Sequence, residues 1–133
     1  MDKEKTEKMI RLAEKVGHVL IATADQKGSP HMASSGRMEL QRDGRLSLSE
    51  WFCPGTLSNL QHNPRISVVV WDPEADFGYQ LLGETEGIEE TAIQDGYSPL
   101  LETSRIPQVE RKILFRVDRV LHFSLAPHSD IEE

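Results

Sequence analysis

The sequence has one cysteine, Cys53, in 133 residues, so no disulfide can form within the chain. A chain without disulfides suits a reducing compartment, and its first residues, MDKEKTEKMIRLAEK, lack the apolar segment of a secretory signal. No apolar run approaches the roughly 20 residues that a transmembrane helix needs. We therefore expect a cytoplasmic protein that makes no contact with a membrane.

Basic residues are also scarce, since 15 Lys and Arg stand against 22 Asp and Glu, for a formal net charge of −7. Nucleic acid binding needs a basic face, and none stands out, so nucleic acid is not an expected partner. The five histidines have no zinc-ligand spacing and Cys53 has no CxxC partner, so we expect no metal site. Because the common phosphate-loop, dinucleotide, hydrolase and metalloprotease motifs are missing too, those classes are not expected.

What remains is a chain of ordinary globular composition, 38% hydrophobic and 28% charged, which suits one domain over residues 1–133. The spacing of Met9, Ile10, Ala13 and Val16 predicts an N-terminal helix that Gly17 can end. A short helix is expected between Thr56, as N-cap, and Pro64, and another within the mixed segment 91–110. Strands are expected at residues 18–24, 30–40, 45–49, 66–71, 77–89 and 113–125. Six strands in hairpin order predict a mainly β fold, a compact antiparallel barrel.

The segment Pro54-Gly55-Thr56 carries the most informative local chemistry. Glycine lets a ligand approach the backbone, and a helix N-terminus offers unpaired N–H groups that favour an anion. Thr56 and Ser58 can add hydroxyl donors. The pattern predicts a phosphate site, with the alternative that Thr56 only caps a structural helix.

Other small or polar residues allow two interpretations each. Ser34, Ser35 and Gly36 could leave room for a flat ring on a strand face, or could face water at a barrel rim. Arg37 could neutralise a phosphate or be a solvated strand residue. Cys53 is more typical of a small buried hydrophobe than of a nucleophile.

Taken in order, these segments resemble the pyridoxamine-phosphate-oxidase-like FMN-binding split-barrel family. VGHVLIATADQKGSPH is similar to its first two strands around a Gly-x-Pro turn, and KILFRVDRVLHFSLAP to its closing strand. DGRLSLSEWFCPGTLSNLQHNPRISVVV resembles its third strand, phosphate loop and fourth strand, with Thr56-x-x-Asn59-Leu60 before Asn63-Pro64-Arg65 as the most specific piece. The resemblance implies a six-stranded antiparallel split β-barrel of Greek-key type, with an N-terminal helix and short inserted helices. It also implies a homodimer with FMN at its interface.

The resemblance implies which residues contact the cofactor. The phosphate would lie on Thr56, Ser58 and Asn59, and the flavin and ribityl chain against Ser34, Ser35, Gly36 and Arg37. The end of the third strand, with Ser49, Glu50 and Trp51, would follow the ring edge. A later strand would contribute one contact from Gln80. Other members of the family bind deazaflavin F420 or haem, and a haem site here would use His31 or His122 as its axial ligand.

One departure from the family concerns charge at the phosphate loop. Many members carry Lys or Arg at or just before the position of Thr56, where this chain has Pro54-Gly55. A phosphate would then depend on helix N–H groups, hydroxyls and a cation such as Arg37 or Lys112. The C-terminal Trp and Arg that true pyridoxamine-phosphate oxidases use are not recognisable, so vitamin B6 oxidation is not expected.

The expected function is therefore an FMN-binding flavoprotein, an oxidoreductase or electron carrier acting on an unidentified small molecule. No residue stands out as a general acid or base, and Glu50 is the carboxylate nearest to the expected ring. This leaves open whether the protein is an enzyme. The alternative is a non-catalytic binding or storage module for haem, F420 or another flat ligand.

Overall fold

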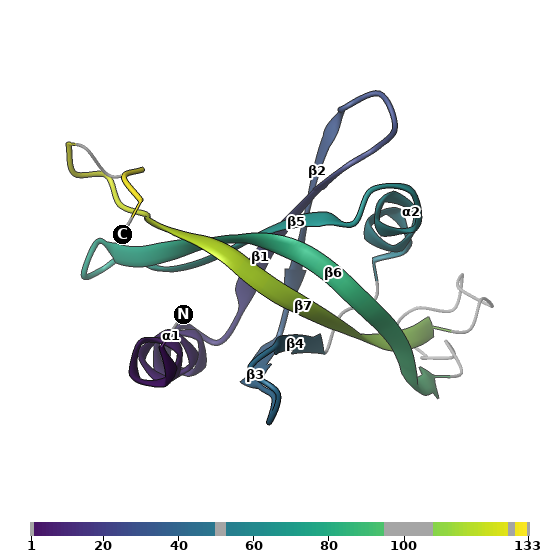
Figure 1. Ribbon diagram of the computed structural model, residues 1–133, viewed down its shortest axis with the longest axis horizontal. Helices are drawn as coiled ribbons and strands as arrows, with labels where there is room; N and C mark the ends of the chain where they lie inside the picture. The colour runs from purple at the N-terminus through teal and green to yellow at the C-terminus, as the bar shows by residue number, and fades with distance from the viewer. Residues whose placement is uncertain (1, 50–52, 95–107, 128–129, 133) are drawn as a thin grey trace, which may run out of the picture.

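The computed structural model describes residues 2–49, 53–94, 108–127 and 130–132 (Figure 1). Two helices and seven strands follow one another along this part of the chain. In order they are α1 (Lys3–Val16), β1 (Val19–Ala24), β2 (Pro30–Ser35), β3 (Arg37–Leu40), β4 (Leu46–Ser49), α2 (Pro54–His62), β5 (Arg65–Asp72), β6 (Phe77–Gln94) and β7 (Gln108–His122). None of the described helices is both long and apolar enough to cross a membrane.

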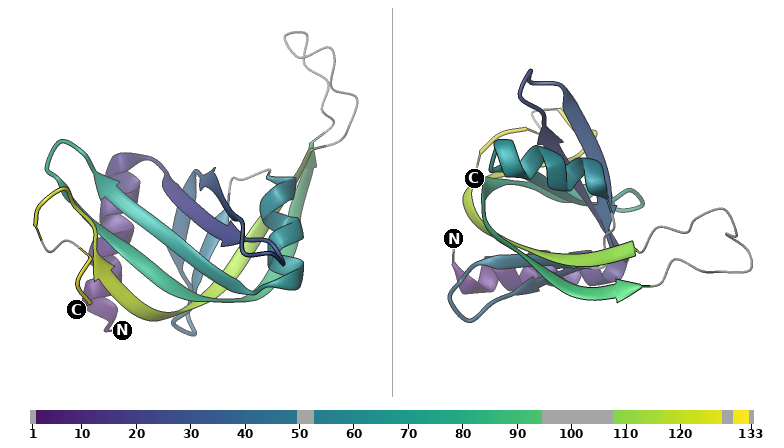
Figure 2. Two further views of the ribbon diagram at one scale, coloured as in Figure 1. Left: turned by 90° about the horizontal axis from the view of Figure 1, so that it is seen from above. Right: turned by 90° about the vertical axis from the view of Figure 1, so that its right-hand side faces the viewer.

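The strands form one antiparallel sheet in the order β2-β1-β5-β6-β7-β4-β3. The sheet curls into an open half-barrel (Figure 2), which confirms the mainly β, antiparallel split-barrel fold. The structure has one strand more than expected, because the segment 30–40 breaks after Ser35 into β2 and β3. The break lets β2 pair with β1 while β3 pairs with β4 on the opposite edge of the sheet.

The curl depends on irregular pairing between the two longest strands, β6 and β7. Their register shifts at Leu82/Gly83, Thr85/Gly87 and Glu90/Ala92, and such bulges bend and twist a strand pair. At Gly83 a Cβ would lie 1.9 Å from the carbonyl oxygen of Arg116, so the close approach of the two strands requires glycine there. The segment 91–110, within which a short helix is expected, is strand at residues 91–94 and 108–110, and residues 95–107 lie outside the described part.

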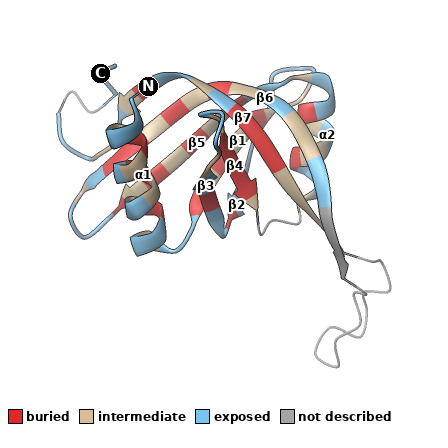
Figure 3. Cartoon of the chain, turned by 60° about the horizontal axis from the view of Figure 1, so that its bottom comes forward, coloured by how far each residue is buried: buried red, intermediate tan, exposed pale blue. Residues whose placement is uncertain are grey.

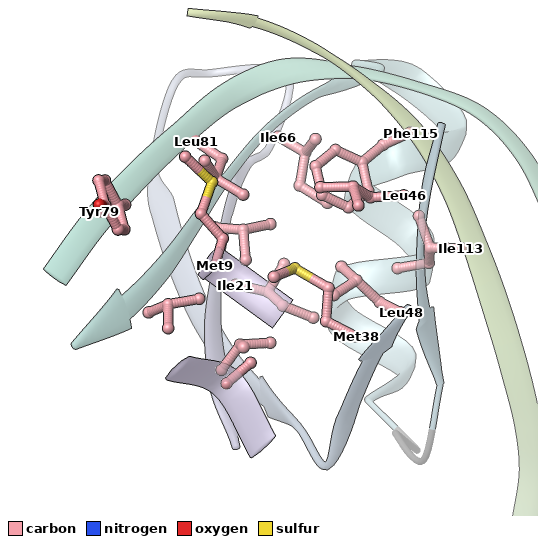
Figure 4. Packing of buried hydrophobic residues seen from close by; sticks show 14 of the residues in the cluster. Met9, Ile21, Met38, Leu46, Leu48, Ile66, Tyr79, Leu81, Ile113 and Phe115 are labelled. Atoms are coloured by element: carbon pink, nitrogen blue, oxygen red, sulfur yellow. The ribbon is translucent and has the colours of Figure 1, made fainter. Parts of the chain in front are cut away.

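Alternating burial shows that the sheet packs on one face (Figure 3). Phe115 is fully buried beside Leu46 and Ile66, and Met9 of α1 joins the same core cluster (Figure 4). Ala13 of α1 is also buried in this cluster. Asp2 caps α1 by accepting a hydrogen bond from the Lys5 N–H at 2.7 Å. Gly17, with φ of 93°, ends this helix as the sequence predicts.

The second helix begins earlier than expected. Its N-cap is Cys53 and Pro54 occupies the first turn, so Thr56 is not the N-cap. The difference has a simple cause, because proline has no N–H to lose and its φ suits the first helical position. Cys53 is half-buried and packs against the core, as expected for a small hydrophobe.

Candidate functional site

The first turn of α2 leaves hydrogen-bond donors without partners on the helix. The Leu57 N–H bonds to the Cys53 carbonyl at 3.2 Å, but the Cys53 side chain makes no capping bond. The N–H groups of Gly55 and Thr56 precede this first intrahelical bond. With the positive end of the helix dipole, they form a place where an anion is favoured.

The Thr56 hydroxyl is a second unsatisfied group in the same turn. Thr56 is fully buried, and its Oγ1 has no hydrogen-bond partner among the described residues. A buried hydroxyl without a partner costs about 1–3 kcal/mol, so its presence calls for an explanation. A phosphate that reaches this turn would supply acceptor oxygens, so the donors present here fit the phosphate end of FMN.

His31 lies directly over this turn from strand β2. A Cβ at Gly55 would lie 3.3 Å from both Cε1 and Nε2 of the His31 ring, so the two residues are in contact. The imidazole is exposed and can donate or accept a hydrogen bond there. Sequence reasoning named His31 only as a haem ligand and missed its place at α2, because the contact joins positions far apart in the chain.

A pocket lies along the flank of α2. Its volume is about 270 Å³, and it is lined by Asp25, Gln26, Lys27, Ser58, Asn59 and His62. The Asn59 side-chain amide donates to Thr23 Oγ1 at 3.0 Å and so holds α2 against β1, while Ser58 is exposed in the pocket. Lys27 brings a cation to α2 that sequence reasoning did not consider. The sequence shows Lys27 in the short β1–β2 turn, but it does not show that α2 packs against this turn.

The two cations expected to replace the missing phosphate-loop charge are engaged elsewhere. Arg37 pairs with Glu39, with Nε and Oε1 3.1 Å apart, and lines a pocket beside the end of α1 together with Gly36. Lys112 donates to Gln41 Oε1 at 3.4 Å, next to the β3–β4 turn. Neither contact involves α2.

Ser35 has a structural position at the corner between β2 and β3. It is buried, and its hydroxyl donates to the carbonyl of Ser49 and contacts that of Arg37 at 3.2 Å. These bonds tie the corner to the end of β4, and they engage the Ser35 hydroxyl, which the family resemblance assigns to the flavin, together with the backbone carbonyl of Ser49. Glu50 and Trp51 lie outside the described residues.

Ser34 and Gln80 share the outer face of the sheet. Ser34 stands opposite Leu20, Leu20 opposite Val69, and Val69 opposite Gln80, and residues directly opposite point to the same face. The Gln80 amide donates to Ser67 Oγ at 2.8 Å. A parallel row on this face consists of Met32, Ala22, Ser67 and Leu82.

The outer face mixes apolar side chains with the polar Ser34, Ser67 and Gln80, and it is only partly covered. Met32 is 60% exposed, and the inner members of both rows are half-exposed. The expected cofactor contacts therefore fall into three groups in one chain: the first turns of α2, the β2–β3 corner and the outer face. We find no group of three or more metal-ligating side chains within the described residues. His122, the other haem candidate, is exposed at the end of β7 and stacks on Tyr79 with ring centroids 6.4 Å apart.

Comparison with known proteins places this geometry in a family. The family model for pyridoxamine 5'-phosphate oxidase matches residues 5–120. No curated protein matches the chain.

Several solved structures share the fold. HupZ of Group A Streptococcus is 22% identical, with a TM-score of 0.61 over 94% of this chain and 97% of that one. A Clostridium acetobutylicum protein related to general stress protein 26 is 20% identical, with a TM-score of 0.65 over 100% and 96% of the two chains. An FMN-binding protein from Syntrophomonas wolfei is 18% identical, with a TM-score of 0.60 over 91% and 87%. At these identities the likeness concerns the fold, while the family model covers most of the chain, which therefore belongs to the pyridoxamine 5'-phosphate oxidase family.

Proposed function

We propose that this protein binds FMN between two copies of the chain and uses it as an electron carrier or reductase. The observation that carries the proposal is the first turn of α2, where N–H groups and the buried Thr56 hydroxyl lack partners among the described residues. The family resemblance implies that the cofactor phosphate would lie at this turn. The FMN-binding protein from Syntrophomonas wolfei is one relative that supports the choice of flavin.

The phosphate would be held by Gly55 and Thr56, with additional donors from the β1–β2 hairpin. His31 contacts Gly55, and Lys27 lines the pocket along α2. These two side chains would compensate for the lysine or arginine that many members carry in the phosphate loop. Charge-assisted bonds to phosphate are the strong ones, so the hairpin would contribute much of the affinity.

A second copy of the chain would complete the site. The outer face carries Ser34 and Gln80 among apolar residues that one chain leaves partly exposed, with Met32 60% exposed at its edge. Apolar surface of this kind is stabilised when a partner removes it from water. A homodimer through this face would cover it and place polar groups from both copies beside the ring.

When bound, FMN supplies the electron-transfer chemistry, and the protein orients it and tunes its surroundings. The polar side chains of the two outer-face rows, from Ser34 to Gln80 and from Met32 to Leu82, are neutral hydroxyl and amide groups. They can bind and orient a ring edge, but they do not form an acid–base pair. We therefore assign these outer-face residues to binding and positioning.

The proposal is tested by titrating the purified protein with FMN, F420 and haem in parallel. Quenching of FMN fluorescence at one flavin per chain is the expected result. The alternative, a non-catalytic haem-binding or storage module, is favoured by the exposed His31 ring and the missing loop cation. A Soret band that disappears in His31→Ala, with no response to FMN, would establish that alternative and overturn the flavin proposal.

The dimer is tested by placing a charge on the outer face. Met32→Glu buries a carboxylate at the proposed interface, so sedimentation should give a monomer, and FMN affinity should fall about tenfold or more. Leu125→Glu is the control, because Leu125 is 83% exposed and lies beyond β7. If the wild-type protein sediments as a monomer and still binds FMN, the shared site is wrong.

A further inference from the structure

Another pocket lies between the start of α1 and the β3–β4 turn. Its volume is about 490 Å³, and it is lined by Lys3, Thr6, Leu40, Gln41, Arg42 and Gly44. Small-molecule sites in proteins commonly enclose about 300–1,000 Å³. None of its lining residues is acidic.

The two cations at this pocket have no carboxylate partner within the part of the chain that the structure describes. The ion pairs that do form use other cations, such as Arg37, Arg45 and Arg116, and the net charge of the chain is −7. Lys3 and Arg42 therefore keep uncompensated positive charge at one place on an acidic protein. Asp2, which precedes Lys3, uses its carboxylate to cap α1.

The other flank of the same hairpin gives an internal comparison. There a pocket is lined by Asp43, Arg45, Glu86 and Arg116, and the charges neutralise one another. Arg45 Nη2 lies 2.8 Å from Asp43 Oδ2, and its hydrogen bond lowers the pKa of the Asp43 carboxyl. The charges on this flank of the hairpin therefore neutralise one another, whereas the flank with Lys3 and Arg42 keeps its positive charge.

Gln41 is fixed at the base of the pocket by both ends of its amide. Its Nε2 donates to the buried Ser47 Oγ at 2.7 Å, and its Oε1 accepts from Lys112 Nζ at 3.4 Å. A third cation therefore stands behind the lining. Leu40 adds a half-buried apolar wall between these polar groups.

We propose that this pocket binds a small organic anion, a carboxylate or phosphate joined to an apolar body. Lys3 and Arg42 take the acidic group, and Leu40 takes the apolar part. Arg42 is suited to the acidic group, because its guanidinium can form two parallel bonds to a carboxylate or phosphate. The site is independent of the flavin proposal, since the two share no residue.

The test uses phenyl phosphate as the probe and follows backbone amide shifts of the ¹⁵N-labelled full chain, with and without saturating FMN. We expect shifts at residues 40–44 in both samples, and weaker binding as salt rises. Inorganic phosphate should bind more weakly because it leaves Leu40 unused. Shifts spread over other surfaces, or absent from residues 40–44, would overturn the proposal whatever FMN does.

Arg42→Gln should weaken phenyl phosphate binding about tenfold or more, since it removes a charge-assisted bond. Arg11→Gln is the matched control, because Arg11 is an exposed arginine on α1 outside the pocket lining. Equal weakening in both variants would mean a diffuse charge effect and no site. FMN binding should be unchanged in both variants. The loss of phenyl phosphate binding in Arg42→Gln then reports on this pocket and does not depend on the flavin site.

Discussion

Replacing Thr56 by valine should strengthen the fold and weaken the cofactor site at the same time. Valine has nearly the same shape as threonine but carries a methyl group where threonine has its hydroxyl. Because Thr56 Oγ1 is buried and has no partner among the described residues, the substitution removes a desolvated polar atom and no internal hydrogen bond. If the hydroxyl bonds the phosphate, the same change removes a contact to the ligand.

Both effects have an expected size. An unsatisfied buried polar group costs about 1–3 kcal/mol, so we expect the free energy of unfolding of the ligand-free protein to rise by about 1 kcal/mol or more. For a chain of this length that corresponds to a rise in Tm of roughly 3–5 °C. A bond to a charged group contributes about 1.5–3 kcal/mol, so FMN affinity should fall about ten- to a hundredfold.

Thr85→Val provides the matched control. Thr85 Oγ1 is also buried without a partner among the described residues, but its backbone N–H bonds to Pro64, beyond the other end of α2. Thermal unfolding and FMN fluorescence titration should show a stability gain in both variants and an affinity loss in Thr56→Val alone. A Thr56→Val protein that is less stable than wild type would refute the unsatisfied hydroxyl, and unchanged affinity would refute its place in the phosphate site.

Two further predictions concern the fold. The hydrogen bond from Lys15 lowers the pKa of Asp72 below its ordinary 3.8. The Lys15–Asp72 pair therefore stabilises the folded state above pH 3.8, and this stabilisation is lost as the pH falls through the lowered pKa. Urea unfolding of Asp72→Asn should therefore show lower stability at pH 7 and a difference from wild type that shrinks below about pH 4; a constant difference would contradict it. Gly83→Ala should lower Tm by an amount equivalent to about 1–3 kcal/mol or more, because its Cβ would lie 1.9 Å from the Arg116 oxygen. Gly87→Ala, where the nearest atom is 3.8 Å away, should change Tm little, and equal effects would exclude the steric cause.

The fold could be predicted because its signals are local and repeated. Alternation in segments such as residues 66–71 follows directly from the side-chain period of a strand that packs on one face. The end of β2 was harder to predict. Ser35 ends that strand because its hydroxyl is bonded to the backbone of Ser49, and a contact across 14 positions leaves no mark on either segment. The expected strand at 30–40 therefore appears as two strands.

The candidate site was predictable only where its chemistry lies within one segment. The Pro54-Gly55-Thr56 turn could be identified because a helix start carries its own donors. The cations could not, since Arg37 and Lys112 seemed free in the sequence but meet Glu39 and Gln41 in the fold. Lys27 reaches α2 only because β1 pairs with β5 and α2 folds back over the hairpin, which is a property of the assembled sheet.

The two helices of this chain give the strongest physical argument that the start of α2 serves a ligand. α1 has a side-chain cap, because Asp2 accepts a hydrogen bond from the Lys5 N–H, and it ends at Gly17, whose N–H bonds to the Ala13 carbonyl. α2 has Cys53 where Ser, Thr, Asp or Asn would supply a cap, and it adds an unpartnered hydroxyl at Thr56. Each of these features costs on the order of 1 kcal/mol in a protein whose total stability is typically about 5–15 kcal/mol. The same chain forms a side-chain cap at α1, so an open turn at α2 is best explained by a partner that satisfies its donors only when bound. That partner should raise the free energy of unfolding by RT ln(1 + L/Kd), where L is its free concentration.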